Sequence, residues 1–189
     1  MEHITRRDPL RVGFVPGVTP GKWETAWVEL HRRTKTQHLT LVPVEVDDAE
    51  RLVRDGELDM VIMRGWAEVD GVHQIPLYKE TAVAVVAKDH AAAAFDELEL
   101  RDLADELDIL AEFPDLDLPM AIETAAAGTG YVLVPMSLAR LHHRKDVTAR
   151  PVLDAKKSPV NLVWLVDRDD VDTQNFVGVV RGRRPNSSR

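Results

Sequence analysis

The residues Gly17–Lys22 form a short loop between an apolar run, Leu10–Pro16, and the start of an expected helix. A strand–loop–helix corner of this kind presents backbone N–H groups and the positive end of the helix dipole to an anion. A nucleotide-binding Walker loop would need glycine in place of Pro16 and serine or threonine in place of Trp23, so that pattern does not match. The corner therefore suits a carboxylate or another small anion, with ordinary helix capping as the alternative. The candidate contacts are Val18, Thr19, Pro20, Gly21 and Lys22.

A second group of candidates, Arg64, Gly65 and Trp66, stands at the end of the nearly continuous apolar run 59–64. Open α/β sheets bind ligands at the carboxyl ends of their strands. In that position Arg64 would pair with an anion, and Trp66 would close over it. The alternative is a surface arginine beside a tryptophan that packs against the protein.

A third corner, Pro135–Ser137, follows the strand-like run 131–135. Pro135 and Ser137 are candidate ligand contacts, although serine at such a position is more typical of a helix cap. The nearby Gly128–Gly130 is not a dinucleotide fingerprint, because Leu133 occupies the third glycine position and a strand follows instead of a helix. We interpret Gly128–Gly130 as a turn.

The remaining residue types do not assemble a catalytic or metal site. The chain has no cysteine, and its seven histidines are scattered, with His142 and His143 on different sides of an expected helix. Ser137 lacks the glycine-flanked elbow of serine hydrolases. The acidic pairs Asp47–Asp48 and Asp169–Asp170 are typical of helix starts. The sequence therefore predicts no bound metal, no cofactor and no enzymatic activity.

Composition narrows the class of protein. The 189 residues are 44% hydrophobic and 30% charged, and the longest apolar runs, 81–87 and 160–166, are far shorter than the roughly 20 residues of a membrane-spanning helix. From the N-terminal residues we expect no secretion signal, and the absence of cysteine suits a cytoplasmic protein. A net charge of −8 disfavours direct binding to nucleic acid, whose phosphates attract basic residues.

The elements that must hold these residues alternate between strand and helix over the first eighty positions. We expect strands at 10–16, 39–46 and 59–64, one helix capped by Thr19 with Pro20 in its first position, and another from Asp47 to Gly56. Apolar residues at helical spacing, which should face a sheet, are Trp23, Ala26, Trp27 and Leu30. In the second half we expect strands at 73–77, 80–88, 107–111, 131–135, 147–152 and 160–166, and helices at 100–105, 120–127, 137–143 and 170–180.

The order of several motifs resembles the effector domain of LysR-type transcriptional regulators. These motifs are Leu10–Phe14, Leu52–Ile62, Ile75–Glu80, Val86–His90, Leu100–Ala104 and Ala126–Pro135. The resemblance implies an α/β, two-lobed, type 2 periplasmic-binding-protein-like fold, with mixed sheets covered by helices and a small-molecule cleft between the lobes. It implies lobe I at 10–80 plus 167–181 and lobe II at 81–166, with flexible termini at 1–9 and 182–189.

Two departures from the family pattern qualify this expectation. Only nine residues precede the first strand, so we expect no winged helix-turn-helix domain and no promoter binding. Between Leu110 and Met120 the family has a further helix and strand, whereas this chain has only nine residues, so we expect a shortened second lobe.

The leading hypothesis is a non-enzymatic domain that binds and senses a small organic anion and forms a homodimer, with a protein partner possible. One alternative is a ligand-free dimeric scaffold with a degenerate cleft, contacting its partner through the basic tail Arg181–Arg189. The alternative interpretation of this tail is a disordered terminus that only aids solubility. A third hypothesis is an enzyme on the same fold, since fold alone does not determine chemistry.

Overall fold

The computed structural model describes residues 9–34, 36–65 and 70–182, and the chain divides into two compact units. Unit 1 comprises the described residues up to Tyr78 and those from Pro159 onward, and unit 2 is Lys79–Ser158. The sequence prediction placed the lobe boundaries after 80 and after 166. The second boundary lies earlier in the structure, because the strand that was assigned to lobe II pairs within the sheet of unit 1.

Unit 1 is built on a five-stranded mixed sheet in the order β2-β1-β3-β8-β4. The strands are β1 (Leu10–Phe14), β2 (Leu39–Pro43), β3 (Met60–Arg64), β4 (Val72–Glu80) and β8 (Ser158–Leu165). β1 pairs in parallel with β2 and β3, whereas β3 pairs antiparallel with β8. The parallel part is the βαβαβ order that the sequence predicts. The carboxyl ends of β1 and β3 therefore meet at one edge of the sheet.

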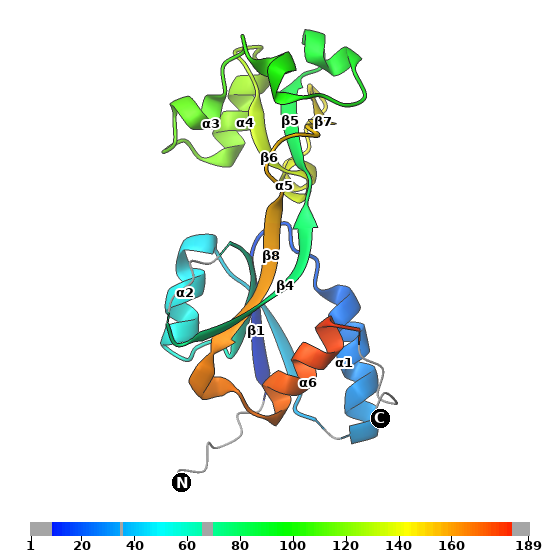
Figure 1. The fold of residues 1–189 in the computed structure, drawn as a ribbon, viewed down its shortest axis with the longest axis vertical. Coiled ribbons are helices and arrows are strands. Elements are labelled where there is room, and N and C mark those ends of the chain that lie inside the picture. Colours follow the sequence, from blue (N-terminus) through cyan, green and yellow to red (C-terminus); the bar gives the residue numbers. More distant parts are fainter. Residues whose placement is uncertain (1–8, 35, 66–69, 183–189) are drawn as a thin grey trace. The chain divides into compact units, whose positions relative to one another are not determined.

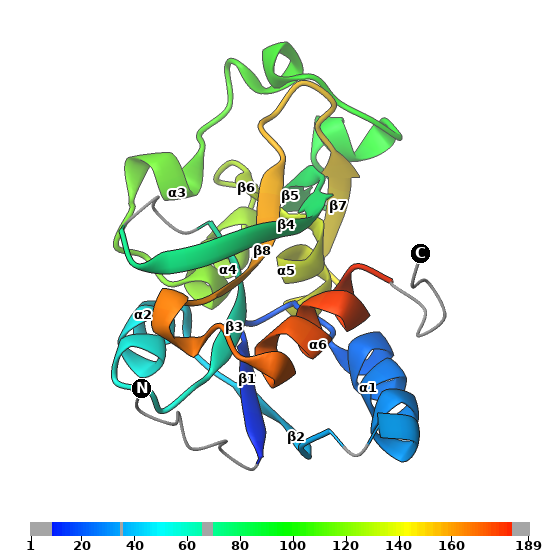
Figure 2. The ribbon, with the colours of Figure 1, turned by 60° about the horizontal axis from the view of Figure 1, so that its bottom comes forward.

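Helices cover both faces of this sheet. α1 (Gly21–Thr34) and α6 (Val171–Val180) lie together on one side of β1, and α2 (Val46–Arg54) lies on the other (Figures 1 and 2). In α1, Trp23 and Trp27 are buried as predicted, although Ala26 of the same predicted stripe is exposed.

Acidic residues begin two of these helices, as the sequence predicts. Asp47 and Asp48 stand in the first turn of α2. The Asp170 carboxylate accepts hydrogen bonds from the amides of Asp172 and Thr173, at 3.0 and 3.1 Å, at the start of α6. Asp170 satisfies free N–H groups of α6, whereas Asp47 and Asp48 are favoured by the positive end of the α2 dipole.

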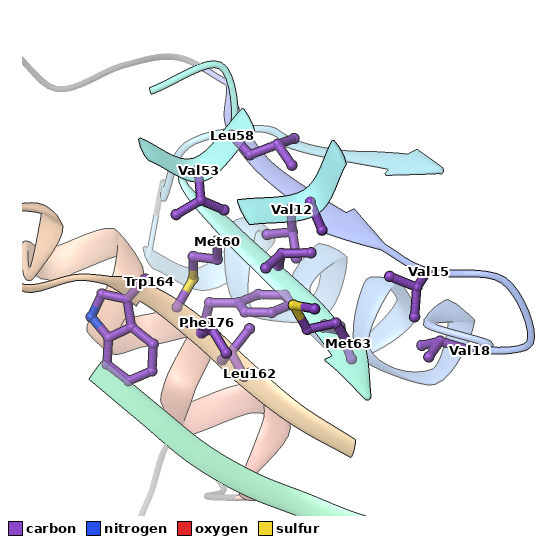
Figure 3. Packing of buried hydrophobic residues seen from close by; sticks show 14 of the residues in the cluster. Val12, Val15, Val18, Val53, Leu58, Met60, Met63, Leu162, Trp164 and Phe176 are labelled. Atoms are coloured by element: carbon purple, nitrogen blue, oxygen red, sulfur yellow. The ribbon is translucent and has the colours of Figure 1, made fainter. Parts of the chain in front are cut away.

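The core of unit 1 packs the sheet against the paired helices α1 and α6 and against α2. Met60, Leu162 and Phe176 lie next to one another in Figure 3, and each is fully buried. The rings of Trp27 and Phe176 pack with their centroids 5.7 Å apart, which fastens α1 to α6. Hydrophobic burial therefore holds the sheet edge that carries the β1–α1 loop.

A buried ion pair connects the start of β3 with the start of α6. The Asp59 carboxylate, 2% exposed, accepts hydrogen bonds from Arg168 Nε at 3.1 Å and Nη2 at 2.7 Å. Its other oxygen accepts the backbone N–H of Arg11 at 2.8 Å. Arg168 also pairs with Asp170, the cap of α6. The guanidinium thus joins β3 and α6 through two carboxylates.

Unit 2 contains a smaller sheet in the order β6-β5-β7, with both pairings antiparallel (Figure 2). Its strands are β5 (Ala82–Ala87), β6 (Val132–Pro135) and β7 (Val147–Pro151). Every residue of β5 is buried, so this central strand is covered on both faces. Around the sheet lie two 3₁₀ turns, η1 (Ala91–Ala94) and η2 (Leu100–Leu103), and the helices α3 (Ile109–Glu112), α4 (Leu118–Ala126) and α5 (Met136–Leu141).

The prediction of a strand at 107–111 is wrong. Only Asp108 makes a strand-type bridge, to Tyr131, and the chain then turns into α3. The Asp108 side chain accepts the amide of Ala111 at 3.2 Å and so caps this helix. A short apolar run does not distinguish a strand from a buried helical turn, and here the capping aspartate favours the helix.

Within the described residues, none of the helices combines the length and apolar character needed to span a membrane.

Candidate functional site

The loop between β1 and α1 is a tight turn attached to β3. The Val15 amide extends the β1–β3 pairing by donating to the Ile62 carbonyl at 3.1 Å. The Val18 amide then donates back to the Val15 carbonyl at 3.1 Å, around Gly17, whose φ of 82° favours glycine. The Val18 and Pro20 side chains are buried. Among the five candidates of this corner, Thr19, Gly21 and Lys22 are therefore the exposed ones.

The first helical hydrogen bonds of α1 end at the Pro20 carbonyl, which accepts from the amides of Trp23 and Glu24 at 2.9 and 3.2 Å. The helix therefore begins at Gly21, slightly later than the expected start with Pro20 in the first position. Pro20 has no N–H to offer to a ligand. The amides of Gly21 and Lys22 belong to the first turn, where N–H groups have no acceptor within the helix.

The ammonium group of Lys22 lies over aromatic rings. Its Nζ is 4.7 Å from the centroid of the Trp23 ring and 5.8 Å from that of Tyr78 in β4. Contacts of this kind attract a cation to the ring face. No described carboxylate forms an ion pair with Lys22. The positive charge of Lys22 thus belongs to the first turn of α1 and lies over the Trp23 and Tyr78 rings.

Arg64, the last residue of β3, reaches the same loop. Its Nη1 donates to the Pro16 carbonyl at 2.7 Å, and the residue as a whole is half-buried. Gly65 follows with a φ of 63°, and its amide donates to the Pro159 carbonyl at 3.2 Å. The structure therefore brings Arg64 to the β1–α1 loop, with a backbone carbonyl as one partner. Trp66, the third candidate of this group, lies outside the described residues.

The candidates of unit 2 lie where β6 passes into α5. Pro135 ends β6 and pairs with Ala82, and the Met136 amide donates to the Thr81 carbonyl at 3.0 Å. Pro135 takes the cap position of α5, so the half-buried Ser137 stands inside the first turn of the helix. The expected capping role therefore falls to a residue without a side-chain acceptor.

The comparison of sequences decides the family. A family model described as the LysR substrate binding domain matches residues 4–115, which is more than half of the chain. The chain belongs to the LysR substrate-binding-domain family. Membership implies small-molecule effector sensing within a transcriptional regulator. No curated protein sequence matches this LysR substrate-binding domain.

Solved structures share its fold at low sequence identity. The effector binding domain of BenM with its effector benzoate has a TM-score of 0.70 and 17% identity, over 95% of this chain and 97% of that one. Full-length CbnR complexed with its target DNA has a TM-score of 0.67 and 17% identity, over 92% and 70%. A mutant OxyR regulatory domain from Pseudomonas aeruginosa has a TM-score of 0.67 and 20% identity, over 95% and 97%. The chain therefore has the type 2 periplasmic-binding-protein fold of LysR effector domains.

Two contacts of this LysR substrate-binding domain escaped sequence reasoning. Tyr78 falls within the Ile75–Glu80 motif, where the sequence assigns it no role, yet it is a ring partner of Lys22. The bond between Arg64 and Pro16 joins residues 48 positions apart. No local pattern predicts either contact, since both depend on which strands become neighbours in the sheet.

Two observations concern the titratable groups outside these corners. Among the described residues, no group of three or more histidine, aspartate or glutamate side chains is arranged to hold a metal ion. Burial raises the pKa of Tyr131 above its ordinary value, and the charge and hydrogen bond of Asp108 raise it further. Asp108 also caps α3, so the phenol is hydrogen-bonded to the residue at the start of that helix.

Proposed function

We propose that this LysR substrate-binding domain is a non-enzymatic sensor of a small organic anion, and that the β1–α1 corner recognises the negative group. The proposed contacts are the Thr19 hydroxyl, the first-turn amides of Gly21 and Lys22, and the Lys22 ammonium. The observation that carries the proposal is the Lys22 cation, which has two aromatic rings and no described carboxylate as partners.

A carboxylate suits this corner for electrostatic reasons. The amides at the start of a helix carry partial positive charge, and an anion there is stabilised by the aligned peptide dipoles. An ammonium beside those amides adds a charge-assisted hydrogen bond, which is stronger than a neutral one. The rings of Trp23 and Tyr78 restrict the ammonium and so reduce the entropy lost on binding.

For unit 2, taken by itself, we propose Pro135 and Ser137 at the start of α5 as ligand contacts. A serine hydroxyl donates to or accepts from a polar ligand group. The Ser137→Ala variant tests this part separately from the anion contacts.

Calorimetry with the purified chain tests the proposal. The probes are benzoate, named with the BenM domain, and succinate, with neutral benzamide as the matched control for charge. We expect at least one carboxylate to bind and benzamide not to bind. Lys22→Met should then raise the dissociation constant of that carboxylate by about tenfold to a hundredfold, since a hydrogen bond to a charged group contributes ~1.5–3 kcal/mol.

The matched control is Lys156→Met, which removes the same charge from an exposed position in unit 2. It should leave the dissociation constant unchanged. Equal binding of benzoate and benzamide, or equal loss in both lysine variants, would contradict recognition by Lys22. A lack of heat with both carboxylates would count against the sensing role itself.

A further inference from the structure

Two residues of β3 hold two consecutive residues of the β1–α1 loop. The Ile62 carbonyl accepts the Val15 amide at 3.1 Å, and the Arg64 side chain donates to the Pro16 carbonyl at 2.7 Å. The first bond continues the pairing of β1 with β3. The second holds the loop at the position where its backbone leaves the sheet.

The Pro16 carbonyl is a sensitive point of the loop. Gly17 follows it with a φ of 82°, and glycine has more accessible backbone conformations than any other residue. Pro16 is half-buried, and a carbonyl removed from water without a partner is unfavourable. A charge-assisted bond from Arg64 satisfies this carbonyl and limits rotation at the glycine that follows.

We infer that Arg64 is a positioning residue, which orients Thr19, Gly21 and Lys22 by fixing the Pro16 carbonyl from the end of β3. The relevance to recognition rests on the proposed function, whereas the effect on the loop does not. In this role the guanidinium acts through the loop backbone and not by contact with the anion. Lysine at position 64 keeps a cationic donor, and methionine removes it while keeping a long side chain.

Hydrogen exchange of the ligand-free chain tests this inference. The reporters are the amides of Val18, Trp23 and Glu24, each hydrogen-bonded within the loop or to Pro20. In Arg64→Met these amides should exchange about tenfold faster or more. Local opening of the loop then requires less free energy, because the bond from the charged Arg64 donor to the Pro16 carbonyl is absent. In Arg64→Lys most of the protection should return.

The matched control is Arg11→Met. The Arg11 side chain also donates to a backbone carbonyl in unit 1, that of Glu57 at 3.2 Å. This variant should leave the Val18 amide as protected as in the parent chain. The Leu58 amide, bonded to the Leu52 carbonyl at 3.0 Å, reports on the rest of unit 1 and should not change in Arg64→Met.

Three results would overturn the inference. Unchanged exchange at Val18 in Arg64→Met would show that the bond does not hold the loop. Equally faster exchange at Val18 and Leu58 would assign Arg64 to the general stability of unit 1. If Arg64→Lys does not restore protection, a cationic donor at position 64 is not what protects these amides. All three are measured without ligand, so they are distinguishable from a failure of benzoate or succinate to bind.

Discussion

Substitution of Arg168 by methionine removes the main partner of a buried carboxylate. Asp59 is 2% exposed and Arg168 is 14% exposed at their side chains, so neither charge is well solvated. Two N–H groups of Arg168 bind one oxygen of Asp59, at 3.1 and 2.7 Å. After the substitution Asp59 would keep only the Arg11 amide at 2.8 Å. The carboxylate would then be buried without a countercharge.

Loss of one member of a buried ion pair destabilises a protein by about 3–5 kcal/mol, because the remaining charge stays desolvated. The Asp170 cap of α6 loses its contact with the guanidinium in the same variant. We therefore expect the free energy of unfolding of unit 1 to fall by about 4 kcal/mol, which is a large part of the ~5–15 kcal/mol of a typical domain.

Asp59→Asn completes a double-mutant cycle. The asparagine keeps an oxygen for the Arg11 amide but carries no charge, so methionine at position 168 no longer strands a carboxylate. The double variant should therefore be more stable than Arg168→Met alone, by about 2 kcal/mol or more.

Urea unfolding followed by tryptophan fluorescence measures these differences. All four tryptophans of the sequence lie outside 79–158, so the signal reports on unit 1. Arg144→Met is the control, because Arg144 pairs with Asp146 at an exposed site and its removal should barely move the midpoint. A loss below about 1 kcal/mol in Arg168→Met, or a double variant as unstable as that single one, would refute the argument.

Three further predictions concern unit 2 and α6. Gly130→Ala would place Cβ 2.2 Å from the Leu107 carbonyl oxygen, so the free energy of unfolding, followed by circular dichroism, should fall by about 2 kcal/mol or more. In Gly178→Ala, within α6, the new Cβ meets nothing within 4 Å, so the free energy of unfolding should rise by about 0.5–1 kcal/mol. Unchanged stability of Gly130→Ala would contradict the close contact. Because the pKa of Tyr131 is raised above 10.0 by burial and by Asp108, the unfolded chain ionises first, and stability should fall as pH rises above about 10. Urea midpoints across this range should fall less steeply in Tyr131→Phe, and identical slopes would refute the assignment.

Sequence patterns predicted the elements that local chemistry specifies. Asp170 begins a helix because its carboxylate accepts free amides of the first turn, and Asp47–Asp48 stand in a first turn, where the helix dipole favours negative charge. Trp23 and Trp27 are buried because helical spacing places them on one face of α1. The order of motifs from Leu10 onward also indicated the LysR family, and the family match confirms it. The expected homodimer and cytoplasmic location stay predictions.

The sequence did not predict which strands and helices pack beside one another. The apolar run 160–166 was recognised as a strand, but its composition says nothing of which strand lies beside it, and it pairs with β3 in unit 1. At 107–111 an apolar run of strand length became a capped helical turn. In both segments hydrophobicity predicted that the residues are buried but not which element covers them, because the hydrophobic effect is non-directional.

The candidate site divides in the same way. The sequence by itself determined a strand–loop–helix corner and a basic residue at the end of β3, since glycine, proline and charge act locally. Only the tertiary structure decided that Arg64 holds Pro16, that Lys22 lies over Tyr78, and that Arg168 neutralises Asp59 across 109 positions. Each of these contacts requires strands or helices distant in sequence to become neighbours, and only the packing of the whole sheet selects those neighbours.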